Sequence, residues 1–254
     1  MLRTLLFLGT TAMVTPAFAA SEHFVERSVD VNGRTYRYQV FVPTSPPEHP
    51  AVVLFLHGSG ERGDDNTKQL AQGLPPWLDK HPDFPAIVVI PQTPDGQEWT
   101  DQANTSMAMA ALEQSVTEFH GDRHRLYLTG LSMGGYGSWQ IAAQYPGTFA
   151  AAAIICGGVT AFDDERALVV HGMPSDVDPF EWTARKIGHL PVWIFHGAED
   201  RVVPTWQSRR MYAALTDRQA TVRYTEFPGV NHGSWDKAYG TPDLWTWMFA
   251  QRRP

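Results

Sequence analysis

Five short, uninterrupted apolar segments constrain the fold of this 254-residue chain more than any other feature. They span residues 51–56, 86–90, 126–129, 150–156 and 192–195, and each ends at or beside a glycine or proline. Segments of this length and composition are typical of strands buried on both faces of a parallel sheet. Helical patterns lie between them, at residues 103–120, 132–145 and 205–215. The sequence therefore predicts an α/β fold with right-handed crossovers and helices on both faces of a mostly parallel sheet.

The two ends of the chain and one long connection complete this organisation. Asn32-Gly33 lies between two alternating segments and predicts an N-terminal antiparallel hairpin. A last strand is expected at residues 221–227 and a last helix at 244–251. Residues 160–190 form an insertion, in which residues 179–187 read as a helix. No linker divides the chain, so residues 21–254 are expected to form one domain.

The first twenty residues have the form of a secretory signal peptide. A single arginine, Arg3, precedes an apolar stretch, and Ala17-Phe18-Ala19 fits the small-x-small cleavage pattern. The stretch is short and interrupted for a spanning helix, which needs about 20 apolar residues, although an uncleaved anchor is the alternative. We expect a periplasmic or secreted protein with no membrane association after cleavage.

Charge and cysteine content exclude several function classes. The formal net charge is −7, with basic residues scattered, which argues against sequence-independent binding to nucleic acid. The only cysteine, Cys156, cannot form an intrachain disulfide, and its apolar surroundings favour a buried, inert thiol over a nucleophile. The zinc motif H-E-x-x-H is absent, and neither a metal nor a cofactor is expected. The oligomeric state is left open.

One serine among glycines, in L-Y-L-T-G-L-S-M-G-G-Y-G at residues 126–137, suggests nucleophilic chemistry. G-L-S-M-G matches the G-x-S-x-G pattern, in which a strand turns sharply into a helix and exposes the serine hydroxyl. The expected strand before it and the helical pattern after it supply that context. We interpret Ser132 as a nucleophile, against the alternative of a structural Gly-Ser turn.

A serine hydroxyl needs a base, and the base needs a carboxylate to orient it. In this fold the chain order is serine, acid, histidine. Glu199-Asp200 follows the strand at 192–195 and supplies two candidate acids. Of the ten histidines only His232 follows the last expected strand, which makes it the candidate base. His57 and His196 end strands and are expected to shape loops.

The negative charge that develops in the transition state also needs hydrogen-bond donors. A glycine-rich turn after the first apolar segment offers one of them. The segment is L-F-L-H-G-S-G-E-R-G-D-D-N, residues 54–66. One backbone amide is expected from Ser59 or Gly60 and the other from Met133, directly after the nucleophile. Glu61 and Arg62 are expected to brace this loop through hydrogen bonds, with binding of an acidic substrate by Arg62 as the alternative.

These segments together resemble secreted α/β-hydrolase esterases. The resemblance rests on residues 54–66, on P-Q-T-P-D-G-Q-E-W (91–99), on G-L-S-M-G-G-Y-G, on F-H-G-A-E-D-R-V-V-P (195–204) and on P-G-V-N-H-G-S-W-D-K-A-Y (228–239). Such proteins are labelled phospholipase/carboxylesterase or dienelactone-hydrolase-like, sometimes prolyl-oligopeptidase-like "predicted peptidase". Feruloyl esterases and polyhydroxybutyrate depolymerases are related. The resemblance implies the α/β-hydrolase fold and selects Asp200 over Glu199. It implies a triad of Ser132, Asp200 and His232, with Ser59 and Met133 as oxyanion donors.

The sequence thus predicts a serine esterase that acts on a short-chain or aryl ester, including feruloyl or acetyl esters of polysaccharide. Trp99, Trp182 and Trp235 are candidate substrate contacts because aromatic side chains dominate ligand pockets, although core packing is an equal alternative for each. A serine peptidase with the same triad and a non-catalytic binding module on a hydrolase scaffold are the alternative functions.

Overall fold

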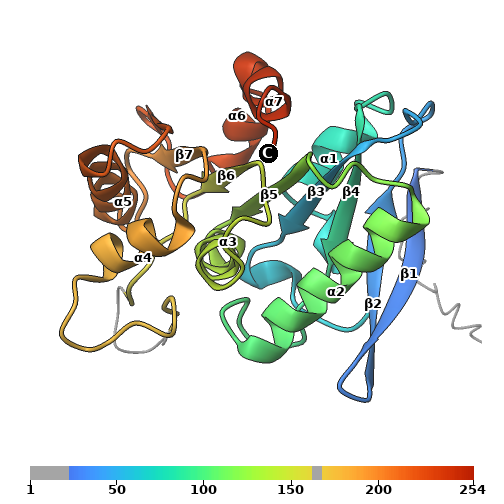
Figure 1. Ribbon diagram of the computed structural model, residues 1–254, viewed down its shortest axis with the longest axis horizontal. Helices are drawn as coiled ribbons and strands as arrows, with labels where there is room; N and C mark the ends of the chain where they lie inside the picture. The colour runs from blue at the N-terminus through green and yellow to red at the C-terminus, as the bar shows by residue number, and fades with distance from the viewer. Residues whose placement is uncertain (1–22, 162–167) are drawn as a thin grey trace, which may run out of the picture.

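The computed structural model describes residues 23–161 and 168–254, and the signal peptide predicted at residues 1–20 lies outside them. An eight-stranded sheet has the order β1-β2-β4-β3-β5-β6-β7-β8 (Figure 1). Its strands are β1 (Phe24–Val31), β2 (Arg34–Phe41), β3 (Ala51–Leu56), β4 (Ala86–Pro91), β5 (Leu126–Leu131), β6 (Ala151–Ile155), β7 (Val192–Gly197) and β8 (Val222–Phe227).

The N-terminal hairpin is antiparallel and the rest of the sheet is parallel. β1 pairs antiparallel with β2, and β2 pairs antiparallel with β4. From β4 to β8 every neighbouring pair is parallel. At the hairpin turn Asn32 has φ 51° and Gly33 has φ 79°, the two positive values that a type I′ turn requires. The predicted fold class is confirmed.

Two layers of helices cover the sheet, and alternation along each strand separates the two cores (Figure 1). In β3, Leu54 and Leu56 point into one core, whereas Val53 and Phe55 point into the other. The first core contains α2 (Gln102–Glu118), α3 (Met133–Gln144), α4 (Pro179–Ile187) and α5 (Trp206–Asp217). The second contains α1 (Leu74–Asp79), α6 (Trp235–Tyr239) and α7 (Pro242–Phe249).

The predicted insertion is described in part. Residues 162–167 lie outside the described residues, and the expected helix at 179–187 is present as α4. Asp178 caps α4, because its carboxylate accepts hydrogen bonds from the amides of Phe180 (2.9 Å) and Glu181 (3.1 Å). Within the part of the chain that the structure describes, no helix has the length and apolarity needed to cross a bilayer.

The parallel arrangement determines where a site can form. Because β3 to β8 point in one direction, the loops that follow their carboxyl ends all emerge at one edge of the sheet. Ligands bind at this edge in open α/β sheets. The loop after β3, the turn after β5 and the loops after β7 and β8 carry the residues singled out from the sequence.

Candidate active site

Ser132 occupies a strained turn between β5 and α3. Its backbone has φ 53° and ψ −117°, a sparsely populated conformation for a residue with a side chain. Gly134 makes the turn possible, because a Cβ there would lie 2.7 Å from the carbonyl oxygen of His57 and closer still to that of Leu56. The strand-turn-helix context predicted from G-L-S-M-G is therefore present, and strain of this kind is typical of functional sites.

His232 joins Ser132 to Asp200. The Nε2 atom of His232 lies 2.9 Å from the Ser132 Oγ, and its Nδ1 lies 2.7 Å from the Asp200 Oδ2. The Asp200 side chain is fully buried, whereas the His232 side chain is 18% exposed. Glu199 is exposed, so the structure places Asp200, not Glu199, against the histidine. The three side chains predicted from separate motifs form one hydrogen-bonded chain.

Contacts between the loop of Asp200, which follows β7, and the loop of His232, which follows β8, fix this geometry. Asn231 accepts hydrogen bonds at its Oδ1 from the amides of Arg201 (3.0 Å) and His232 (2.8 Å), so one side chain holds both loops. Gly197 allows the loops to touch, because a Cβ there would lie 2.5 Å from the carbonyl oxygen of Val230. No motif in the sequence indicates this role for Asn231.

Hydrogen bonds keep Asp200 ionised despite its burial. Burial alone would raise the pKa of its carboxyl group, but hydrogen bonds from His196, His232 and the amide of Val202 outweigh that effect and hold the pKa well below its ordinary value. An anionic carboxylate at this position orients the His232 ring and stabilises its charged form.

The predicted oxyanion donors, Ser59 and Met133, come from two separate segments near Ser132. Met133 is the first residue of α3, so its N–H has no acceptor within the helix. Ser59 begins the short 3-10 helix η1 (Ser59–Glu61), directly after Gly58. A Cβ on Gly58 would lie 3.9 Å from the Ser132 Cβ, which places this loop beside Ser132. Amide donors near a helix start favour developing negative charge.

His57 supports the predicted oxyanion loop, residues 58–62, through hydrogen bonds. Its Nδ1 lies 2.6 Å from the Gly58 carbonyl oxygen, and its Nε2 accepts the Thr93 N–H at 3.0 Å. Its own carbonyl oxygen accepts the indole N–H of Trp99 at 2.9 Å. Trp99 is 0% exposed, so it takes a supporting position under the loop instead of the expected substrate contact. Burial lowers the pKa of His57 to about 4.

Arg62 braces the loop by pairing with Glu98 and not with its neighbour Glu61. Its Nε donates to the Gln97 carbonyl (2.6 Å), and its Nη2 donates to the Glu98 carboxylate (2.6 Å). Glu61, the last residue of η1, is buried, and this burial raises the pKa of its carboxyl group. The amide hydrogen bonds that it accepts from Gly58 and from its own backbone oppose this effect. Arg62 therefore ties the oxyanion loop to the segment before α2.

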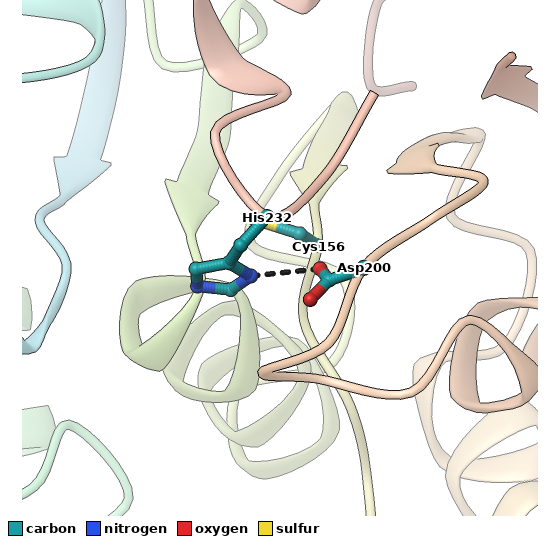
Figure 2. A group of neighbouring side chains, drawn as sticks. All are labelled: Cys156, Asp200 and His232. Carbon is teal, nitrogen blue, oxygen red and sulfur yellow. Dashed lines mark hydrogen bonds and ion pairs between the residues drawn. The ribbon is translucent and has the colours of Figure 1, made fainter. Parts of the chain in front are cut away.

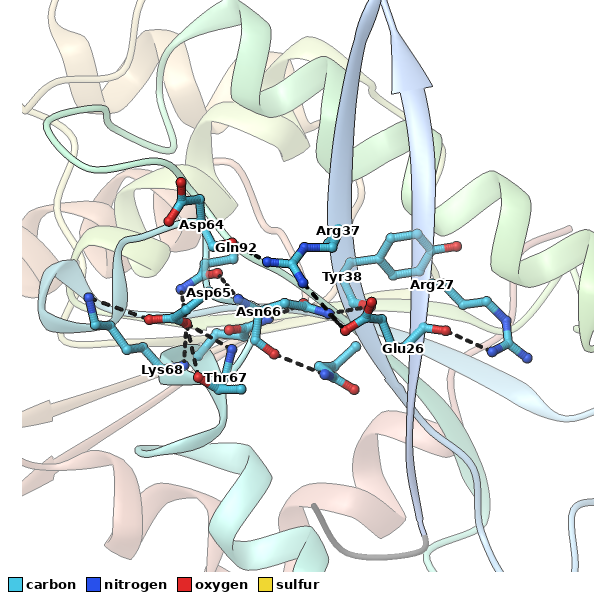
Figure 3. A network of polar contacts seen from close by, with 12 residues as sticks. Glu26, Arg27, Arg37, Tyr38, Asp64, Asp65, Asn66, Thr67, Lys68 and Gln92 are labelled. Carbon is cyan, nitrogen blue, oxygen red and sulfur yellow. Dashed lines mark hydrogen bonds and ion pairs between the residues drawn. The ribbon is translucent and has the colours of Figure 1, made fainter. Parts of the chain in front are cut away.

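The residues that follow the loop, Asp64 to Lys68, form a polar network with β1, β2 and Gln92, the residue after β4 (Figure 3). Gln92 donates to the Glu61 carbonyl (3.1 Å) and to the Asp65 Oδ1 (3.1 Å), and accepts the Asn66 N–H (2.7 Å). Burial of Asp65 opposes ionisation, but the amides of Lys68 and Thr67 outweigh it and keep the pKa of Asp65 low. This network explains the G-D-D-N segment as a structural support.

The other two tryptophans occupy different environments. Trp182 is 7% exposed in α4, where the Lys186 Nζ lies 5.4 Å from its ring centre, so core packing explains it. Trp235 is half-buried and meets the His232 ring edge to face, with ring centres 5.7 Å apart. Of the three candidate contacts, Trp235 alone lies against His232, and its contact with substrate stays a prediction.

Cys156 lies close to Asp200 and His232 (Figure 2). Its sulfur and ligand atoms of Asp200 and His232 lie within 4.8 Å of one another. A metal ion bound by all three would require the thiolate and would compete for the Asp200–His232 hydrogen bond. Burial raises the pKa of Cys156 to about 12, which opposes thiolate formation. This cluster is therefore better suited to a protonated thiol than to a metal.

Known proteins resemble the chain, some over most of its length and others over a part of it. Feruloyl esterase B of Thermothelomyces thermophilus is 25% identical over 92% of this chain and 88% of its own. A crystal structure of a thermostable esterase is 31% identical, with a TM-score of 0.72, over 91% of this chain and 64% of the other. Poly(3-hydroxyoctanoate) depolymerase of Pseudomonas fluorescens is 33% identical, but the match covers 40% of this chain and about a third of that enzyme (33%).

A family model supplies the broader assignment. The dienelactone hydrolase family model matches residues 80–239, which include the nucleophile turn and the loops of Asp200 and His232. The fold, with its mostly parallel sheet and antiparallel N-terminal hairpin, is that of the α/β-hydrolases. The chain therefore belongs to the dienelactone hydrolase family.

Proposed function

We propose that the protein is a serine-dependent carboxylic ester hydrolase. The observation that carries the proposal is the hydrogen-bonded chain from Ser132 through His232 to Asp200, at 2.9 Å and 2.7 Å. His232 accepts the proton of the Ser132 hydroxyl as its oxygen attacks the ester carbonyl carbon, and Asp200 stabilises the resulting imidazolium.

The same groups complete the cycle. The carbonyl oxygen gains negative charge, which the amides of Met133 and of Ser59 or Gly60 stabilise. His232 then gives its proton to the departing alcohol, which leaves an acyl group on Ser132. Water attacks this ester in turn, with His232 as the base, and releases the acid. This sequence needs no metal or cofactor.

The names of relatives favour an ester carried by a polysaccharide. Two feruloyl esterases and an acetylxylan esterase of Aspergillus ficuum are similar to this chain. We therefore propose a short-chain or aryl ester, such as a feruloyl or acetyl group on plant polysaccharide, as the substrate. Export to the periplasm or the medium is part of the proposal; it rests on residues 1–20, and an uncharacterized secreted protein of Arthroderma benhamiae is a further relative.

A substrate panel on paired variants tests the proposal. Three purified proteins are compared: the wild type, Ser132→Ala and the matched control Ser115→Ala, which changes a buried serine of α2. Each is assayed on p-nitrophenyl acetate, methyl ferulate, acetylated xylan and an N-acyl amino acid p-nitroanilide. We expect ester hydrolysis by the wild type and Ser115→Ala, and loss of at least about 10³-fold in Ser132→Ala. Full activity of Ser132→Ala on esters would refute the role of Ser132, and turnover of the anilide alone would favour a peptidase.

A further inference from the structure

A second histidine contacts the proposed catalytic acid. His196, in the strand β7, is fully buried, and its Nε2 lies 3.1 Å from the Asp200 Oδ2, the oxygen that also bonds His232. Its Nδ1 lies 2.7 Å from the hydroxyl oxygen of Ser208 in α5. A line of five polar side chains therefore extends from Ser208 through His196, Asp200 and His232 to Ser132.

The partners of His196 define its tautomer. Its Nε2 faces two acceptors, the Asp200 carboxylate and the Val203 carbonyl oxygen at 3.0 Å, so this nitrogen carries the proton. Its Nδ1 then accepts the Ser208 hydroxyl proton. With its proton on Nε2, His196 satisfies all of these groups at once. The hydrogen bond from Ser208 to Nδ1 also opposes a flip of the ring, which would place the unprotonated Nδ1 against Asp200.

The carboxylate of Asp200 thus has two donors on each oxygen. Oδ2 accepts from His232 and His196, and Oδ1 accepts the amides of Val202 (2.8 Å) and Val203 (2.9 Å). Among the described residues, two other titratable groups face Asp200 and His196. They are the Cys156 thiol, close to Asp200, and Glu226 of β8, close to His196. Glu226 pairs with Arg209 and accepts a hydrogen bond from the Tyr224 hydroxyl.

We propose that His196, held by Ser208, is a positioning residue that fixes the Asp200 carboxylate and moderates its attraction for the His232 imidazolium. The inference rests on the proposed function, because it assigns His196 a role in the same triad. Without the His196 donor, Oδ2 would keep His232 as its one partner, and only that bond and the two amides at Oδ1 would hold the orientation of the carboxylate. The remaining negative charge would hold protonated His232 more strongly, so His232 would become available as a base only at higher pH.

The test compares His196→Gln, which keeps an N–H donor at similar reach, with His196→Leu, which keeps bulk but no donor. Tyr127→Phe is the control, because it removes a β5 side-chain hydrogen bond, to Gln251, at the opposite edge of the sheet. A charge-assisted hydrogen bond corresponds to roughly a tenfold to hundredfold effect. We expect kcat of His196→Leu to fall at least about tenfold with KM unchanged, and the acid limb of its kcat/KM profile to move to higher pH. His196→Gln should recover most of both, and Tyr127→Phe should behave as the wild type.

Two results would overturn the inference. One is a His196→Leu enzyme with the wild-type kcat and acid limb. The other is equal loss in the Gln and Leu variants with no movement of the acid limb, which would show a packing role only. If His196→Leu does not fold, Ser208→Ala replaces it, and there an acid limb at the wild-type position overturns the proposal. Failure of the proposed function is recognised separately, by ester turnover that persists in Ser132→Ala.

Discussion

Lowering the pH from 7.5 to 4 should destabilise the fold through His57. This imidazole is fully buried, donates from Nδ1 to the Gly58 carbonyl and accepts the Thr93 N–H at Nε2. Both bonds require the neutral ring with its proton on Nδ1. A second proton would occupy the lone pair that Thr93 needs and would put a charge where water cannot reach it.

The pKa values give the size of the effect. Burial is the main cause that lowers the pKa of His57 from 6.5 to about 4 in the folded state. Between these values the unfolded chain binds a proton that the folded chain does not, so stability is fully present above pH 6.5 and falls as the pH decreases towards 4. At about 1.4 kcal/mol per pH unit, and with half protonation at the folded pKa, the loss at pH 4 is about 3 kcal/mol. This is a large part of the roughly 5–15 kcal/mol that stabilises a typical domain.

Urea unfolding of the wild type and His57→Gln at pH 7.5 and pH 4 measures this loss. The variant will be less stable at both values, but it lacks the titrating group. The free energy of unfolding of the wild type should therefore decrease by about 3 kcal/mol more than that of the variant between the two pH values. Equal decreases in the two proteins would refute the reasoning, because they would show that His57 does not resist protonation.

Three further substitutions test the geometry of the site. Asp200→Asn should lower kcat by roughly 10⁴-fold, the loss typical of this change in a serine triad, while circular dichroism shows an intact fold; kcat within tenfold of the wild type would remove Asp200 from the mechanism. Gly197→Ala would place a Cβ 2.5 Å from the Val230 carbonyl oxygen and displace the His232 loop, so kcat should fall about 100-fold or more; unchanged kinetics would show that the loop yields without cost. Trp99→Phe removes the donor to the His57 carbonyl and should reduce the free energy of unfolding in urea by about 1–3 kcal/mol, an effect that a solvated carbonyl would not produce.

The sequence predicts the framework and the triad because those residues stand at recognisable positions. Apolar segments locate the parallel strands, and Ser132, Asp200 and His232 each follow one of them at the edge where the strands end. Asn32-Gly33 predicts the hairpin through the backbone angles its turn requires. These inferences use local pattern and chain order, except that the family resemblance is needed to select Asp200 over Glu199.

The parts that the sequence does not predict depend on contacts between distant segments. For Trp99 the sequence leaves substrate contact and core packing as equal alternatives; the structure shows it fully buried, with its indole N–H donating to the His57 carbonyl. His196 gives no sign in the sequence that it faces Asp200, and Arg62 pairs with Glu98 across 36 positions. The helices α1 and α6 are too short for a helical period, although the prolines at the start of α1 were a usable signal.

Covalent labelling with a fluorophosphonate, followed by mass spectrometry of proteolytic peptides, tests the central claim most directly. The phosphonyl group should be found on Ser132 in the wild type, with the peptide of residue 132 unmodified in Ser132→Ala and labelling strongly slowed in His232→Ala. Labelling of another residue at the same rate in the wild type and in Ser132→Ala would contradict the account.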